Sequence, residues 1–146
     1  MSSRREARRT AIDILYQADI TDAAPSEVLR DWTGAGQDVP TFARELVEGV
    51  TDKLPDIDLL LEEHAEDWTV ARMAALDRTI LRVAVYEVLW REDIPASVAI
   101  SEAVEAAAEL SADESKRFVN GILGKIAREA GAGAEAQVED AGGIDS

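Results

Sequence analysis

Apolar residues recur at helical spacing along almost the whole chain, and this periodicity constrains the fold more than any other feature of the sequence. No hairpin dipeptide is flanked by alternating apolar and polar residues, so the sequence contains no candidate β-hairpin. The periodicity predicts an all-α protein. A chain of 146 residues of which 47% are apolar is long enough and apolar enough to bury a core.

Prolines, glycines and capping residues divide the periodic sequence into six expected helices. Segment 71–90 is apolar around much of its circumference, which is typical of a central, buried helix. Ser111 and Glu114 have the spacing of a capping box, which predicts the start of the last helix. The expected helices are 4–20, 25–32, 41–64 with Pro55 inside it, 71–90, 95–110 and 111–130.

The last part of the sequence differs in composition from the rest. Residues 131–146 are mainly glycine, alanine and acidic residues without an apolar period, which predicts a disordered tail. We therefore expect a single helical domain over residues 1–130, followed by an acidic tail over 131–146.

Composition also limits the cellular setting. The chain has no cysteine, which excludes disulfides, thiolate nucleophiles and cysteine zinc sites. No apolar run is long enough to span a bilayer, and the basic start lacks a signal-peptide cleavage pattern. These features predict a soluble protein, and we expect a cytoplasmic location.

Positive charge is concentrated in two segments of an otherwise acidic chain. The formal net charge is −15, and such a charge ordinarily repels nucleic acid. However, Arg4, Arg5, Arg8 and Arg9 lie within six residues, and a second basic segment covers residues 116–128. Electrostatic interactions are screened over about 8 to 10 Å, so each basic segment acts nearly independently of the distant acids. The net charge therefore does not exclude an RNA partner.

The first expected helix has two distinct faces. One face should point to the core and consists of Ala7, Ala11, Ile14, Leu15 and Ala18. The second face points elsewhere and consists of Arg5, Arg9, Ile12, Tyr16 and Ile20. Cations at a helix N-terminus oppose the macrodipole by a few tenths of a kcal/mol each, so the arginines are not expected to stabilise the fold. Either a phosphate partner binds them, or they form a solvated end while Tyr16 packs under a neighbouring helix.

Asp77 projects into an apolar stripe of the expected central helix. An unpaired buried carboxylate would be costly, so two interpretations remain open. Asp77 either has an internal partner, such as an arginine or a helix-end amide, or it faces another protein. Arg78 and Arg82 lie on a different face, where they could pair with other acids.

The second basic segment places cations beside an aromatic ring. Lys116 and Arg117 precede Phe118 in the first turns of the last expected helix. Cations for phosphates and a ring for base stacking are typical of single-stranded RNA binding. The alternative is that Phe118 belongs to the core and its neighbours are solvated. Gly121 lies inside the helical pattern and suggests a close approach between helices.

No arrangement of residues indicates catalysis or a metal site. His64 follows two glutamates, but a ferritin-like Glu-x-x-His pair would need an acid at position 61, which is Leu61. The zinc-protease pattern, a phosphate-binding glycine loop and a nucleophile elbow are all absent. We therefore expect a protein that is not an enzyme and that has no cofactor, although acids near His64 leave a metal-dependent enzyme as a second hypothesis.

Four sequence blocks resemble one known family in the same order and spacing. The blocks are RREARRTAIDILYQ, LDRTILRVAVYEVL, IPASVAISEAVEAA and KRFVNGILGKI, and the resemblance spans residues 4–130. Together they resemble the NusB family of bacterial transcription antitermination factors.

The resemblance implies a fold and a function. It implies two small helical bundles packed into one compact domain. It also implies binding of boxA RNA in ribosomal RNA leader transcripts together with NusE, a small-subunit ribosomal protein, within an RNA polymerase antitermination complex. A homodimer is a further candidate state. The residues that match RNA-binding positions are Arg4, Arg5, Arg8, His64, Lys116, Arg117 and Phe118, and those that match NusE-binding positions are Tyr16 and Asp77.

The chain departs from the family pattern in one place that matters for RNA binding. Glu6 stands where some relatives have a third consecutive arginine, which weakens the basic cluster. The same helical region also resembles the N-terminal RNA-binding part of certain ribosomal RNA cytosine methyltransferases, which continue into a catalytic domain. The alternative function is therefore a structural RNA-binding or oligomerising helical module.

Overall fold

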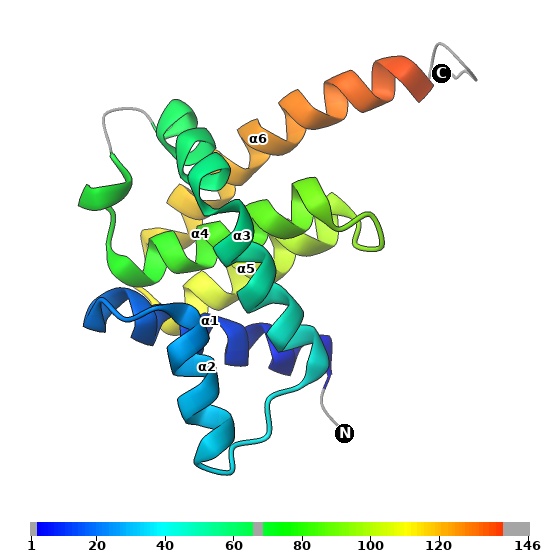
Figure 1. The fold of residues 1–146 in the computed structure, drawn as a ribbon. Helices are drawn as coiled ribbons and strands as arrows, with labels where there is room; N and C mark the ends of the chain where they lie inside the picture. The colour runs from blue at the N-terminus through cyan, green and yellow to red at the C-terminus, as the bar shows by residue number, and fades with distance from the viewer. Residues whose placement is uncertain (1–2, 66–68, 139–146) are drawn as a thin grey trace.

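The computed structural model describes residues 3–65 and 69–138, with side chains through residue 131. Its helices are α1 (Arg4–Thr21), α2 (Pro25–Gly34), α3 (Thr41–His64), the short 3₁₀ helix η1 (Val70–Arg72), α4 (Ala75–Trp90), α5 (Ala96–Leu110) and α6 (Ser115–Val138). The residues described contain no strand, which confirms the predicted all-α fold (Figure 1).

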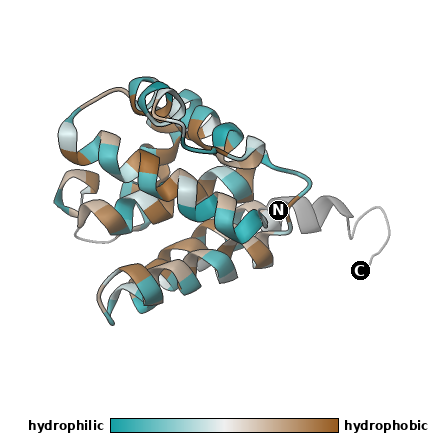
Figure 2. Ribbon diagram, turned by 90° about the horizontal axis from the view of Figure 1, so that it is seen from below, coloured by the Kyte–Doolittle hydropathy of each residue, from teal (hydrophilic) through white to brown (hydrophobic). Residues whose placement is uncertain are grey.

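The helices form two groups that share one core. Helices α1, α2 and α3 contact one another, and so do α4, α5 and α6. Helix α4 also packs against α1 and α3, and it therefore joins the two groups (Figure 1). Most helices carry both hydrophobic and hydrophilic residues (Figure 2), as expected for amphipathic helices that each bury one face.

Helix α4 is the buried central helix that its sequence predicts, but it begins later than expected. Val83, Ala84 and Val85 are all buried. The helix starts at Ala75, and the preceding residues form η1 and an extended turn. The guanidinium of Arg78 donates to the carbonyl oxygens of Val70 (3.2 Å) and Met73 (3.1 Å). These bonds satisfy carbonyl groups that a longer helix would have paired internally.

The predicted start of the last helix is wrong, and the helix extends past its predicted end. Ser111 does not cap it, because its hydroxyl donates to Asp77 Oδ1 at 2.6 Å and α6 begins at Ser115. Helix α6 continues through Val138, past the expected boundary at residue 131. Alanine, frequent in this segment, has the highest intrinsic helix propensity. Residues 139–146 lie outside the described residues, so the division into domain and tail stays a prediction.

A close helix approach exists, but at a different glycine from the one predicted. A Cβ added at Gly121 would meet nothing within 4 Å, so the expected close approach there is wrong. A Cβ added at Gly49 on α3 would instead overlap the ring of Tyr86 on α4. Gly49 therefore lets α3 and α4 pack closely.

The described part of the chain contains neither a helix that could span a membrane nor a cluster of metal ligands. None of its helices has the length and hydropathy needed to cross a bilayer. Within the same residues, no group of three or more histidine, cysteine or acidic side chains is placed to hold a metal ion.

Candidate RNA-binding and partner-binding sites

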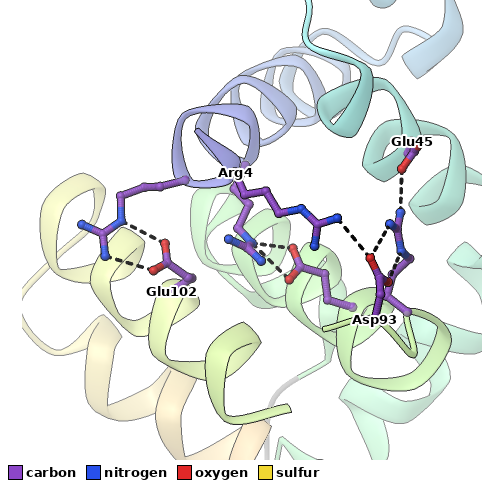
Figure 3. A network of polar contacts seen from close by, with 8 residues as sticks. Arg4, Glu45, Asp93 and Glu102 are labelled. Carbon is purple, nitrogen blue, oxygen red and sulfur yellow. Dashed lines mark hydrogen bonds and ion pairs between the residues drawn. The ribbon is translucent and has the colours of Figure 1, made fainter. Parts of the chain in front are cut away.

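Arg4, Arg5, Arg8 and Arg9 form a row at the start of α1, called here the arginine row. Every member pairs with an acid from a distant part of the chain, and Figure 3 shows Arg4 bonded to Asp93, with the carboxylate of Glu102 on the other side of Arg4. The pairs are Arg4–Asp93 (3.1 Å), Arg5–Glu102 (2.9 Å), Arg8–Glu87 (2.8 Å) and Arg9–Glu109 (2.6 Å). The row is therefore neither a free cationic end nor a simply solvated one.

Arg8 differs from the rest of the row because it is buried. Arg8 is 8% exposed and Glu87 is 1% exposed, and Arg8 Nε donates to both carboxylate oxygens of Glu87. Burial raises the pKa of Glu87, and the hydrogen bond from Arg8 opposes that shift. This pair ties α1 to α4 inside the core. Contrary to the expectation that the arginines do not stabilise the fold, Arg8 is a structural residue here, and its contact with RNA stays a prediction.

Arg4 is held in a surface network. Its guanidinium lies 4.4 Å from the centre of the Phe42 ring and bonds Asp93. Arg91 bonds the same carboxylate and also Glu45, as the dashed lines in Figure 3 show. The hydrogen bond from Arg91, with a further one from Arg4, holds the pKa of Asp93 well below its usual range.

Arg5 is exposed and doubly bonded to one carboxylate. Its side chain is 53% exposed, and Nε and Nη2 donate to the two oxygens of Glu102 at 3.0 and 2.9 Å. The hydrogen bond from Arg5 lowers the pKa of Glu102. Exposed ion pairs contribute only about 0 to 1 kcal/mol, so a phosphate can replace Glu102 at small cost.

A hollow between the end of α3 and α6 brings three predicted RNA-binding residues together. We call it the α3–α6 hollow, and its lining residues are His64, Ala65, Arg117, Phe118, Gly121, Ile122 and Lys125. The end of α3 lies beside α6 (Figure 1), which explains how residues more than fifty positions apart reach one site. Lys116 is exposed next to Arg117 at the start of the same helix.

The cations at the start of α6 differ from the arginine row in their pairing. Within the part of the chain that the structure describes, Lys116 and Arg117 have no carboxylate within ion-pair distance. Phe118 beside them is half-buried, so it packs against the core and also lines the hollow. The two interpretations of Phe118 from the sequence, a core residue and a stacking residue, are therefore compatible. Lys125 is a further cation of the hollow that sequence reasoning missed, although its spacing of eight residues from Arg117 places both on one helix face.

His64 is a buried polar residue with an oxygen partner at each ring nitrogen. It is 7% exposed, with Nδ1 2.8 Å from the carbonyl oxygen of Leu60 and Nε2 3.0 Å from Glu129 Oε2. Burial alone would lower the pKa of His64. The hydrogen bonds to Leu60 and Glu129, with the negative charge of Glu129, outweigh burial and raise the pKa above its usual value.

Asp77 has an internal partner, although not one of the predicted types. Its carboxylate accepts hydrogen bonds from the hydroxyls of Ser111 (2.6 Å) and Ser115 (3.0 Å), neither an arginine nor a helix-end amide. Asp77 is only half-buried and lines a second hollow, which also includes Phe118. The candidate partner-binding residue therefore borders the candidate RNA-binding site.

The predicted internal roles of two other arginines are confirmed. Arg78 Nε bonds Asp19 at 2.8 Å, and Arg82 Nε bonds Asp58 at 2.9 Å. Both pairs connect α4 to other helices of the core, so neither arginine is available for a partner.

Tyr16 is half-buried in the second half of α1. The order of the Arg5–Glu102 and Arg9–Glu109 pairs shows that α1 and α5 run in the same direction (Figure 1). Tyr16 follows Arg9 by two turns, and Arg9 already pairs with Glu109 next to the end of α5, so Tyr16 lies past the end of that helix. Ile12, expected on the outward face with Tyr16, is instead buried against α5.

Comparison with known proteins decides the family. The model of the NusB family matches residues 5–128, nearly all of the described helical region. The chain belongs to the NusB family.

Relatives within the NusB family cover most of this chain. The transcription antitermination protein NusB of Saccharopolyspora erythraea is 49% identical over 130 residues, which cover 87% of this chain and 88% of the relative. The protein of the same name from Leifsonia xyli subsp. xyli is 45% identical over 134 residues, with coverage of 88% and 93%. NusB proteins are antitermination factors without catalytic activity, so the enzyme hypothesis is excluded.

Solved NusB structures have the same fold. The structure of T. maritima NusB superposes with a TM-score of 0.79 at 34% identity, and the match covers 88% of this chain and 92% of the other. NusB in a crystal structure with NusE and double-stranded RNA gives a TM-score of 0.76 at 23% identity, with coverage of 86% and 96%. The predicted two-bundle helical fold is thereby confirmed.

The departure from the family pattern at Glu6 has a structural role. Glu6 N–H donates to Ser3 Oγ at 3.1 Å, and Ser3 N–H donates to Glu6 Oε1 at 3.0 Å. This capping box satisfies two N–H groups at the start of α1. It also places a negative charge where it offsets the unfavourable effect of the arginines on the macrodipole.

Proposed function

We propose that this protein binds boxA RNA of ribosomal RNA leader transcripts together with NusE, and joins the RNA polymerase antitermination complex in the cytoplasm. The observation that carries the proposal is the α3–α6 hollow, where Phe118 lies beside Arg117 and His64. Two further facts support it. The relatives are named transcription antitermination proteins, and one NusB neighbour was crystallised with NusE and RNA.

In the proposed complex, the hollow holds an unpaired base. The ring of Phe118 stacks on the base, an interaction that contributes about 1 to 3 kcal/mol. Arg117 and Lys116 contact the flanking phosphates, and neither gives up a carboxylate partner among the described residues to do so. The hollow therefore provides the stacking surface, and Arg117 in it reaches a phosphate without giving up a described ion pair.

The arginine row contributes in an unequal way. Arg4 and Arg5 are exposed and exchange their carboxylate partners for phosphates at little cost. Arg8 acts indirectly, because its buried pair with Glu87 fixes the start of α1 in place.

NusE binds, in this proposal, on the surface that contains Tyr16 and Asp77. Asp77 is oriented by Ser111 and Ser115 but remains half-exposed, so its carboxylate can still accept a bond from a partner. Because Asp77 and Phe118 line one hollow, bound NusE and bound RNA would be adjacent on this protein.

A titration of labelled boxA RNA and scrambled RNA, each with and without purified NusE, tests the RNA proposal. We expect tighter binding of boxA than of the scrambled RNA, and a further gain when NusE is present. Equal affinity for both RNAs without a NusE effect would favour the structural RNA-binding module. No binding of either RNA would favour a helical oligomer without an RNA ligand.

The NusE surface is tested separately by pull-down. Asp77→Lys should abolish NusE capture while the circular dichroism spectrum stays unchanged. Ser115→Ala is the matched control, because it removes one internal bond of Asp77 but leaves the carboxylate in place. Equal loss of NusE capture in both variants, accompanied by loss of helicity, would assign Asp77 a purely internal role.

A further inference from the structure

The contacts of His64 favour its protonated form. Nδ1 faces the carbonyl oxygen of Leu60 and Nε2 faces Glu129 Oε2, both within hydrogen-bond distance. A carbonyl oxygen and an ionised carboxylate accept hydrogen bonds but cannot donate them. Only the doubly protonated imidazolium can donate to both acceptors at once. The geometry therefore suits a buried cation.

Glu129 has the opposite environment from His64. Its side chain is 73% exposed, whereas His64 is 7% exposed. The Nε2 edge of the imidazolium therefore faces the protein surface, and an exposed carboxylate occupies its outer side. The Nδ1 edge is anchored inside the protein by the helix carbonyl of Leu60, which fixes the direction of the Nε2–H bond.

The surroundings of this contact suit an anion from RNA. His64, Arg117 and Lys125 line the same hollow as Phe118, so three cationic side chains surround the stacking ring. The acid nearest to His64 on its own helix is Glu63, which is exposed. Arg72 of η1 lines the neighbouring hollow with Asp77 instead. A carboxylate is a close chemical substitute for one edge of a phosphate, since both are oxyanions that accept charge-assisted hydrogen bonds.

We propose that Glu129 occupies the position of an RNA phosphate on His64, and that bound RNA displaces this carboxylate, so that a phosphate oxygen accepts the hydrogen bond from Nε2–H in its place. The inference rests on the proposed RNA-binding function and specifies the chemistry of one contact in it. Glu129 thus competes with RNA for the imidazolium, and RNA binding depends on the proton that His64 holds.

The consequence for pH dependence follows from linkage. If an RNA phosphate binds only the imidazolium form, the pKa of His64 is higher with RNA bound than in a protein where Nε2 has neither Glu129 nor RNA as its partner. RNA affinity then weakens as the pH rises above the pKa of free His64. Because one proton is involved, the loss is at most about tenfold per pH unit.

The experiment uses the single histidine of the chain, whose ring gives one set of imidazole signals in a ¹⁵N–¹H NMR spectrum. The pKa of His64 is measured in the unmodified protein and in Glu129→Gln, each free and bound to boxA RNA. We expect Glu129→Gln to lower the pKa in the free protein, and RNA to restore it. The variant should also bind RNA about two- to fivefold more tightly, which is the range for loss of an exposed ion pair.

Glu48→Gln is the matched control. It removes the same charge from an exposed position on α3, about 24 Å along the helix from His64. Equal RNA affinities of the Glu129→Gln and Glu48→Gln variants, or a His64 pKa in Glu129→Gln that RNA binding leaves unchanged, would overturn the inference. If Phe118→Leu and Arg5→Ala still weaken RNA binding in that case, the proposed function is retained and only the inference about Glu129 is lost. A protein that binds no RNA at all would overturn both.

Discussion

The arginine row and the α3–α6 hollow differ in how their positive charges are paired. Every arginine of the row bonds a carboxylate of α4, α5 or the α4–α5 turn. In the hollow, Arg117 has no carboxylate partner among the described residues, and His64 is paired with one exposed acid. The density of cations in a segment therefore does not measure how available they are to a ligand. Availability depends on which helix faces the segment.

The facing helix accounts for the difference. Helix α5 presents Glu102, Glu105 and Glu109 toward α1, at spacings of three and four residues that place them along one side of the helix. In the first turn of α6, no described carboxylate lies within ion-pair distance of Lys116 or Arg117. In the proposed function the row therefore combines a structural role with RNA binding, while Arg117 of the hollow forms no ion pair with a described carboxylate. The following predictions test this division, beginning with the largest effect.

Arg8→Ala should lower the free energy of unfolding by about 3 to 5 kcal/mol, because it leaves the buried Glu87 carboxylate without its partner. Urea denaturation followed by circular dichroism measures the change. The double variant Arg8→Met/Glu87→Leu removes both charges and should regain most of the lost stability. A loss below about 1 kcal/mol in Arg8→Ala would place Arg8 with the exposed arginines of the row.

Phe118→Leu should weaken boxA binding by about 5- to 150-fold, which corresponds to the about 1 to 3 kcal/mol of a base stack. Leucine keeps an apolar contact with the core, so the fold should persist. Fluorescence anisotropy with labelled RNA measures the affinity. Phe42→Leu is the matched control, because Phe42 is the other phenylalanine of the chain and contacts the arginine row instead. Equal effects of the two variants would contradict the assignment of stacking to the hollow.

Gly121→Ala should raise the free energy of unfolding by about 0.5 to 1 kcal/mol, since alanine favours the helix and the added methyl group meets no atom. Gly49→Ala should lower it, because the methyl group would overlap Tyr86. Thermal denaturation of both variants gives the comparison. Destabilisation by Gly121→Ala would show that the hollow is filled in solution and is not an open surface.

Arg5→Ala should change the free energy of unfolding by less than about 1 kcal/mol, because its ion pair with Glu102 is exposed. It should still weaken RNA binding and reduce the slope of log affinity against log salt concentration by about 0.7. Titrations at several salt concentrations measure the slope. An unchanged slope would remove Arg5 from the RNA-binding site and leave the row with a structural role only.

The smallest expected effect is the pH dependence of stability that arises from His64. Because its folded-state pKa is raised, its contribution is fully present below the usual histidine pKa of about 6.5 and is lost as the pH rises through the raised value. Unfolding free energies measured across this range should decrease. The decrease should be smaller in Glu129→Gln, and an identical decrease would show that Glu129 does not stabilise the imidazolium.

Several features of the fold and sites were predictable from local sequence. The periodicity located the helices, and the face formed by Ala7, Ala11 and Ile14 is buried as predicted. The aromatic and basic residues at 116–118 were recognised as a candidate site without a structure. Errors arose where a distant contact replaced a local pattern. Ser111 has the spacing of a cap but bonds Asp77, and Ile12 lies in line with Tyr16 but is covered by α5.

The sequence by itself determined the helical class, the family and the two basic segments, because helix periodicity and motif spacing depend on neighbouring residues. Only the tertiary structure decided which cations are available. Arg8 meets Glu87 across 79 positions and Arg5 meets Glu102 across 97 positions, and no local pattern encodes such pairs. The same holds for the placement of His64 beside Phe118. Packing of helices distant in sequence makes one arginine structural, leaves another exchangeable and forms the hollow proposed to bind RNA.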